Sequence, residues 1–285
     1  MKSKSVSLLP LLVAIVTWIS CGRGRTLPTL GGADSLAIED TLENDSVLFF
    51  EDEDEGLSLD EHETEVFGDF IFAFTHNSRF QAERIRFPLP VTEADGEESV
   101  IRSGRQFREE FQLPGNDYYI LLLGDMQQME GFQNDSSLTE VDFQCISLPE
   151  LSMTSYNFRR TDGHWFLHNR IQSHVNANIV DFLHFYEHFV TDSLFQQERL
   201  ARELSISMED PDGEIGGIEG IIEASQWPMF RPEMPQGKFV HLDFGQTFPH
   251  PDRLYMLQCG ISNGMLNIFT FRRKDGQWKL TAYEN

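Results

Sequence analysis

The feature that most constrains this chain is an 18-residue segment that occurs twice. Residues 67–84 (FGDFIFAFTHNSRFQAER) and 182–199 (FLHFYEHFVTDSLFQQER) align without a gap, at a period of 115 residues. Eight of the 18 positions are identical: Phe67/Phe182, Phe70/Phe185, Phe74/Phe189, Ser78/Ser193, Phe80/Phe195, Gln81/Gln196, Glu83/Glu198 and Arg84/Arg199. Solenoid repeats have periods of about 20–50 residues, so this duplication predicts two tandem domains instead of a repeat array.

Each copy of the segment predicts two helices. Phe182, Phe185 and Phe189 are spaced i, i+3 and i+7, which is one apolar stripe of an amphipathic helix. Ser78 with Gln81 fits a capping box, as does the matching pair of the second copy, so a second helix is expected to begin at each Ser. The Glu-Arg pair that closes each segment is either a packed ion pair or a solvated one.

Strands are predicted behind each helix pair, from segments rich in β-branched and aromatic residues. In the first copy they lie at 83–91, 117–123, 138–148, 153–160 and 164–167, and in the second at 238–244, 253–261, 265–273 and 277–283. Asp162-Gly163 and Asp275-Gly276 each predict a hairpin turn, because Asp-Gly tolerates the positive φ that a tight turn needs. The glycine-rich stretch 214–222 is expected to be a loop-to-helix insert, and Gln144-Cys145 matches Gln258-Cys259 at an offset of 114.

The fold class that follows is α+β. We expect two tandem cone-shaped domains, each a helix pair packed on a curved antiparallel sheet. The predicted boundaries are residues 1–21 for an export signal, 22–65 for a tether, 66–174 for the first cone domain and 175–285 for the second.

The N-terminus has the pattern of an export signal. Lys2 and Lys4 precede an apolar run from residue 8 to 19 that is too short to span a bilayer. It ends in Ser20-Cys21, which resembles a bacterial lipoprotein box, although Trp18 stands where Leu is usual. We therefore expect lipidation of Cys21 and anchoring in the membrane, the alternative being an ordinary cleaved signal.

Charge is concentrated in the predicted tether. The chain carries a formal charge of −24, and residues 34–65 hold 14 acidic residues without a Lys or Arg. Such a composition is typical of a flexible segment, the alternative being a calcium or partner site, and its apolar residues 47–50 could dock on the folded part. No basic stripe is visible in the sequence, so nucleic acid is not an expected partner.

Three motifs together resemble a known family. They are FxxFxxxFxxxSxFQxER, FRRxDGxW and the Cys21 box. The chain looks like a family of bacterial lipoproteins that carry domain of unknown function 4348, with tandem nuclear-transport-factor-2-like domains, from Gram-negative gut anaerobes. The resemblance covers residues 67–285 and the signal. It implies this fold and a cell-envelope location, and it transfers no functional residues.

Two pairs of residues are candidates for metal or thiol chemistry. His184 and His188 fit the zinc signature H-x-x-E-H, but the first copy lacks both, and a helical wheel turns them away from the Phe stripe. We expect a solvated helix face and no metal or cofactor. Cys145 and Cys259 share strand parity, which favours two buried free thiols, with a disulfide as the alternative.

A further set of residues gives weaker evidence for a ligand-binding pocket. His241, Asp243, His250 and Asp252 could supply a general base, and strand parity places His241 and Asp243 on one face, which is expected to be wet. Tyr118 is near the corresponding place in the first copy, and Trp165 and Trp278 match between copies, which favours a role in the core. None is assigned as catalytic.

Three functions remain open. The preferred one is a non-enzymatic, membrane-anchored envelope lipoprotein that binds a small apolar ligand or a protein partner, because packing residues persist in both copies and catalytic ones do not. The alternatives are a hydrolase or isomerase that uses one cone pocket, and a purely structural interaction module.

Overall fold

A computed structural model describes residues 64–111, 117–134, 138–208, 217–261 and 263–285. These described residues belong to one compact unit. The predicted signal, Cys21, the tether up to residue 63 and its apolar residues 47–50 lie outside the described residues.

The described elements fall into two series with a similar order, except that α4 of the first series has no counterpart between β9 and β10. The first copy consists of α1 (Phe67–His76), α2 (Ser78–Glu83), β1 (Leu89–Thr92), β2 (Glu98–Ile101), α3 (Gly104–Glu110), β3 (Tyr118–Leu123), α4 (Gln127–Asn134), β4 (Glu140–Ser147), β5 (Ser152–Thr161) and β6 (His164–His174). The second copy consists of α5 (Val180–Thr191), α6 (Ser193–Glu198), β7 (Leu200–Met208), β8 (Ile218–Ile222), the 3-10 helix η1 (Ala224–Gln226), α7 (Trp227–Phe230), β9 (Lys238–Asp243), β10 (Arg253–Gly260), β11 (Leu266–Lys274) and β12 (Gln277–Glu284).

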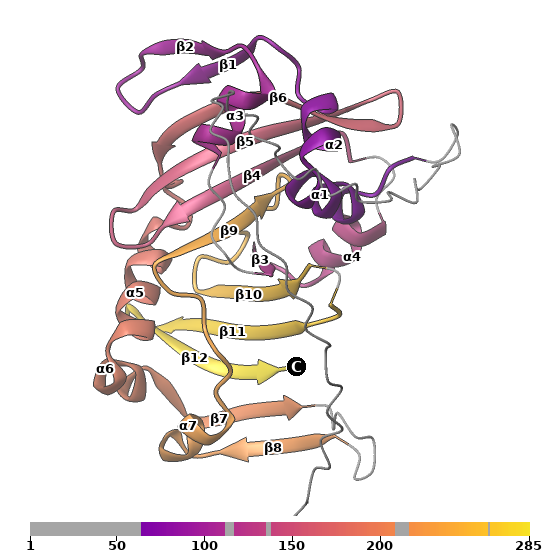
Figure 1. The fold of residues 1–285 in the computed structure, drawn as a ribbon. Coiled ribbons are helices and arrows are strands. Elements are labelled where there is room, and N and C mark those ends of the chain that lie inside the picture. The colour runs from indigo at the N-terminus through magenta and orange to yellow at the C-terminus, as the bar shows by residue number, and fades with distance from the viewer. Residues whose placement is uncertain (1–63, 112–116, 135–137, 209–216, 262) are drawn as a thin grey trace, which may run out of the picture. The chain divides into compact units, whose positions relative to one another are not determined.

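The strands of both copies form one large curved sheet. It has 12 strands in the order β2-β1-β6-β5-β4-β9-β3-β10-β11-β12-β7-β8 (Figure 1). At its centre the copies exchange a strand: β9 of the second copy pairs with β4 of the first, and β3 of the first pairs with β10 of the second. The predicted α+β class is therefore confirmed, and the two copies share a single sheet.

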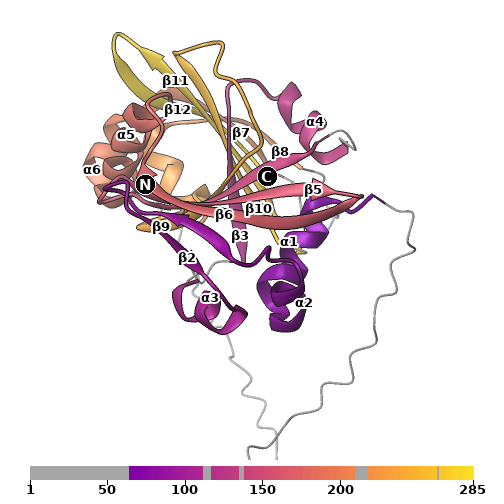
Figure 2. The same ribbon diagram turned by 90° about the horizontal axis from the view of Figure 1, so that it is seen from above.

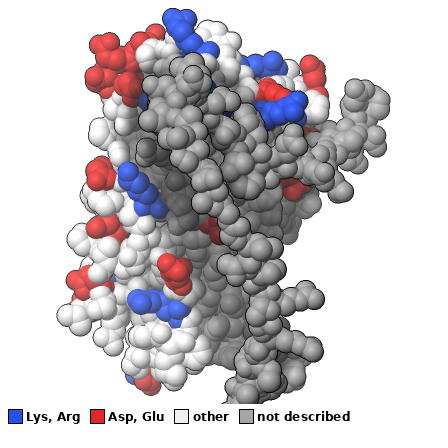
Figure 3. Space-filling model, in the orientation of Figure 1, with Lys and Arg blue, Asp and Glu red and all other residues white. Residues whose placement is uncertain are grey.

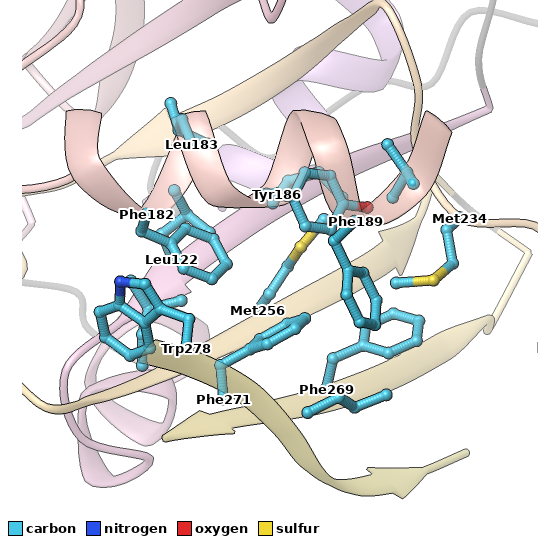
Figure 4. Packing of buried hydrophobic residues seen from close by; sticks show 14 of the residues in the cluster. Leu122, Phe182, Leu183, Tyr186, Phe189, Met234, Met256, Phe269, Phe271 and Trp278 are labelled. Carbon is cyan, nitrogen blue, oxygen red and sulfur yellow. The ribbon is translucent and has the colours of Figure 1, made fainter. Parts of the chain in front are cut away.

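The two helix pairs lie on opposite faces of this sheet. Successive residues of a strand point to opposite faces, and in β3 they alternate between two cores. Ile120 and Leu122 belong to the core under α5, whereas Leu121 and Leu123 belong to the core under α1. Figure 2 shows α1 and α2 on the side of the sheet away from α5 and α6, and Figure 4 shows the aromatic side chains of α5 packed against Phe269 and Phe271 of β11.

Strand register corrects one detail of the internal alignment. Val141 pairs with Phe158 in the first copy and Leu254 with Phe271 in the second, both at an offset of 113. Each copy also has a β-bulge at the equivalent place, before Phe158 and before Phe271. The Gln-Cys match at 114 is thus one residue out of register, and Cys145 and Cys259 do not occupy equivalent positions.

The helix pairs form as predicted, but the predicted capping box is wrong. The side chain of Asn77 caps α2, accepting hydrogen bonds from two backbone N–H groups, and Asp192 does the same for α6. The repeated Gln is buried instead: Gln81 donates to the carbonyl of Phe74 at 3.1 Å, and the matching Gln of α6 repeats this bond. The Gln is shared because it satisfies the end of the preceding helix.

The closing Glu-Arg pair of the first copy is not an ion pair either. Glu83 lies 3.3 Å from the exposed Arg79, whereas Arg84 contacts Glu65 at 3.1 Å. Glu65, expected to end the tether, is buried and also accepts a hydrogen bond from the backbone N–H of Trp165. It thus fixes the entry of the chain into the first copy.

The hairpins and the nine predicted strands agree in place with the structure, but β2, β7 and β8 were not predicted. Asp162 and Asp275 both have φ 52°, and each is followed by a glycine with positive φ. The expected insert at 214–222 is wrong for its described part, because residues 218–222 form the edge strand β8, paired with β7. Residues 214–216 of that stretch lie outside the described residues.

Candidate functional site

The predicted pocket residues do not converge on one site. Trp165 is 1% exposed and packs edge-on against Phe67 in the first core, with ring centroids 5.0 Å apart. Trp278 holds the equivalent place in the second core, 5.5 Å from Phe182. Both tryptophans are core residues on opposite faces of the sheet.

His241 was expected to be wet and is instead 2% exposed. The physical reason is its position on β9, in the middle of a sheet that is packed on both faces. Its Nδ1–H donates to Oε1 of Gln144 at 3.0 Å, and Nε2 accepts from the Gln246 amide at 3.1 Å. Gln144 in turn donates to Asp243 at 3.4 Å.

The hydrogen bonds with the side-chain amides of Gln144 and Gln246 favour the neutral form of the His241 imidazole, because one ring nitrogen donates and the other accepts. Burial lowers the pKa of His241 to about 4, against an opposing effect of Asp243. Both ring nitrogens already have partners, so the side chain is not free to take a proton from a ligand. Tyr118 is half-buried, and burial together with Glu233 raises its pKa. The contacts of Gln144 with His241 and Asp243 join β9 to the neighbouring strand β4 and are structural.

The two remaining constellations also have structural explanations. His184 and His188 are exposed on α5, as predicted, and no group of three or more potential metal ligands occurs among the described residues. Cys145 and Cys259 are free thiols, and burial raises the pKa of each to about 12.

A pocket that the sequence did not reveal lies over β7, β10, β11 and β12. Its volume is about 600 Å³. Six of the 22 Lys and Arg residues of the chain line it, together with His250 and Asp252. These six basic residues are Arg202, Arg253, Arg272, Arg273, Lys274 and Lys279. We call this site the basic pocket.

Sequence reasoning named His250 and Asp252 as candidate bases but missed the basic pocket, because its six basic residues are spread over 78 positions of the chain, from 202 to 279. The one local signal is the run Arg272-Arg273-Lys274, which precedes the predicted turn. Elsewhere the charges are mixed: on the face seen in Figure 3, basic and acidic side chains of the described residues form small groups of both signs. A pocket lined by six basic residues and one carboxylate, in a chain of net charge −24, is therefore a distinct feature.

Comparison with known proteins identifies the fold. Residues 51–285 match the family described as domain of unknown function (DUF4348). The chain is also similar to a crystal structure of an NTF2-like protein from Bacteroides fragilis NCTC 9343, with 30% sequence identity and a TM-score of 0.67, covering 78% of this chain and 96% of that one. No curated protein matches the chain significantly. Among the described residues, no helix is both long and apolar enough to cross a bilayer.

Proposed function

Because the chain belongs to the DUF4348 family and has an NTF2-like fold, we propose that it is a lipid-anchored binding protein of the Gram-negative cell envelope. In this proposal the ligand binds at the molecular surface in the second copy, and the protein performs no chemistry on it.

The observation that carries this proposal is the filled interior of both copies. Large aromatic side chains occupy the space between helices and sheet, where a small apolar ligand was expected. Those less than 2% exposed include Phe70, Phe74 and Phe158 in the first copy and Tyr186, Phe189 and Phe269 in the second. Interiors packed in this way leave surface pockets as the place for a ligand, and the basic pocket is one of them.

We further propose that the two copies are tandem cone domains, 66–174 and 175–285, that arose by duplication and are joined by their exchanged strands. The equivalent bulges and the shared buried Gln support a common origin. The exchange gives each half a strand from the other, which makes the pair interdependent.

The anchor is proposed from Ser20-Cys21 and the preceding apolar run. The tether of 44 residues would average roughly 35–40 Å end to end and more if its charges repel. Mass spectrometry of the N-terminal peptide tests this: an acylated Cys21 is expected, and Cys21→Ser should release the protein from membranes. An unmodified Cys21 in the mature protein would refute anchoring.

The binding role is tested by native mass spectrometry of the full-length protein extracted from its own membranes. We expect a non-covalent adduct of defined mass that is lost on unfolding. A bare polypeptide mass from several preparations, together with turnover of a substrate by the same protein, would refute a purely binding role.

A protein partner is a second candidate, favoured by exposed apolar side chains in the second copy. Leu194 of α6, Ile221 of the edge strand β8 and Met229 of α7 are 72%, 68% and 80% exposed. Edge strands with apolar residues are common sites of strand addition. Crosslinking in whole cells, followed by identification of the linked peptides, would detect such a partner at β8.

A further inference from the structure

The basic pocket contains a row of three basic residues on neighbouring strands. Arg253 of β10 pairs directly with Arg272 of β11, and Arg272 pairs with Lys279 of β12. Directly paired residues point to the same face with Cβ atoms about 5 Å apart. Their neighbours in sequence, Leu254 and Leu280, are buried in the core under α5, so the row lies on the opposite face. We call these three residues the basic row.

This arrangement is unfavourable without a counter-charge. Like charges directly opposite on a sheet destabilise it. Arg253 forms a salt bridge with Asp125, with 3.5 Å between its terminal nitrogen and the carboxylate oxygen, and its Nε is buried without an acceptor. In the part of the chain that the structure describes, Arg272 and Lys279 have no ion-pair partner.

The first copy shows that the fold does not require such a row. At the offset of 113, Arg159 corresponds to Arg272, and its ladder partner is Glu140, which forms a salt bridge with it at 3.3 Å. The third position is Phe166, whose ring lies 3.7 Å from the Arg86 guanidinium carbon. The same sheet positions are therefore charge-compensated in one copy and uniformly basic in the other.

We propose that the basic pocket binds a small polyanion, a free molecule that carries at least two carboxylate, phosphate or sulfate groups. Guanidinium groups bind such oxyanions in a bidentate manner, and charges repeated about every 5 Å across the strands fit separate acidic groups on one ligand. A volume of about 600 Å³ is that of a metabolite site. This inference rests on the proposed binding role and gives it a site and a ligand chemistry.

The test is isothermal titration calorimetry on the full-length protein with citrate and with inorganic pyrophosphate, at ionic strength of about 20 mM, where charge interactions are weakly screened. We expect binding of at least one probe and its weakening as salt is added. Arg272→Gln should lower the affinity at least about tenfold, since it removes charged hydrogen bonds. Arg159→Gln, the matched change in the first copy, should leave the affinity unchanged.

A second variant separates binding from folding. Arg253 of the second copy corresponds to Glu140 of the first, which pairs with Arg159. In Arg253→Glu the new carboxylate is therefore expected to form the equivalent ion pair with Arg272. It should abolish binding of the probe while thermal stability is retained or raised. Circular dichroism verifies that each variant is folded.

Four outcomes would overturn the proposal. The first is no binding of either probe by the wild-type protein, and the second is equal weakening by Arg159→Gln and Arg272→Gln. The third is binding to vesicles with anionic lipid but to neither free probe, which would assign the pocket to a lipid headgroup. A neutral adduct in native mass spectrometry that persists in Arg272→Gln would also refute this site while leaving the binding role intact.

Discussion

The shared sheet predicts that the two copies unfold together, and Phe271→Ala tests this. The ring of Phe271 is fully buried and packs against four aromatic rings of α5, with centroids 5.1–6.3 Å apart. Truncation of a buried Phe to Ala costs about 3–5 kcal/mol. Phe158, the equivalent residue of the first copy, is also fully buried among aromatic rings, so Phe158→Ala should cost a similar amount.

The assay is equilibrium unfolding in urea, followed by far-UV circular dichroism and tryptophan fluorescence. With an m-value of about 3 kcal/mol/M, a loss of about 4 kcal/mol lowers the midpoint by ~1.3 M. Trp165 reports on the first core, and Trp227 and Trp278 report on the second. Because β3 and β9 are exchanged, both probes should follow one transition, and either variant should shift it.

The reasoning would be refuted by two separate transitions, one moved only by Phe158→Ala and the other only by Phe271→Ala. Such a result would mean that the exchanged strands do not couple the cores. Leu194→Ala serves as the control, because that side chain is 72% exposed and its removal should change stability by less than about 0.5 kcal/mol.

Three further predictions concern single groups. Gln81→Ala should cost about 1–3 kcal/mol in urea unfolding, because it leaves a buried carbonyl unpaired, whereas Ser78→Ala should have little effect, since Ser78 is not the cap. The free energy of unfolding should fall as the pH drops from about 6.5 towards 4, because His241 takes up a proton in the unfolded chain at a higher pH than in the folded one. About 3 kcal/mol of this loss should disappear in His241→Gln. If the variant showed the same pH dependence of stability as the wild-type protein, the assignment would be contradicted. Cys145 and Cys259 should resist iodoacetamide at pH 8 until urea is added, read by peptide mass spectrometry, because their raised pKa leaves almost no thiolate; rapid native labelling would show that the thiols are accessible.

Helices and hairpin turns were predictable from the sequence wherever a short segment contains the residues that determine them. The Phe spacing predicted α1 and α5, and Asp-Gly predicted the hairpins at 162–163 and 275–276. The capping residues were harder, because Asn77 and Ser78 are both good caps and neighbouring candidates differ by a single position. The role of Gln81 was not predictable, because its amide donates to a carbonyl seven residues earlier, in the preceding helix, and no helical sequence pattern indicates such a contact.

The sequence by itself determined the α+β class and two similar series of elements with aromatic stripes, because stripe and turn signals act over a few residues. Tertiary structure alone decided that β3 and β9 change places, that His241 of β9 is buried beside Gln144 of β4, and that Arg253 meets Arg272 and Lys279 on one face. The physical reason is that strand pairing depends on long-range backbone hydrogen bonds, which any strand of suitable length and polarity pattern can make. Which strand takes the central position is set by the packing of the whole sheet.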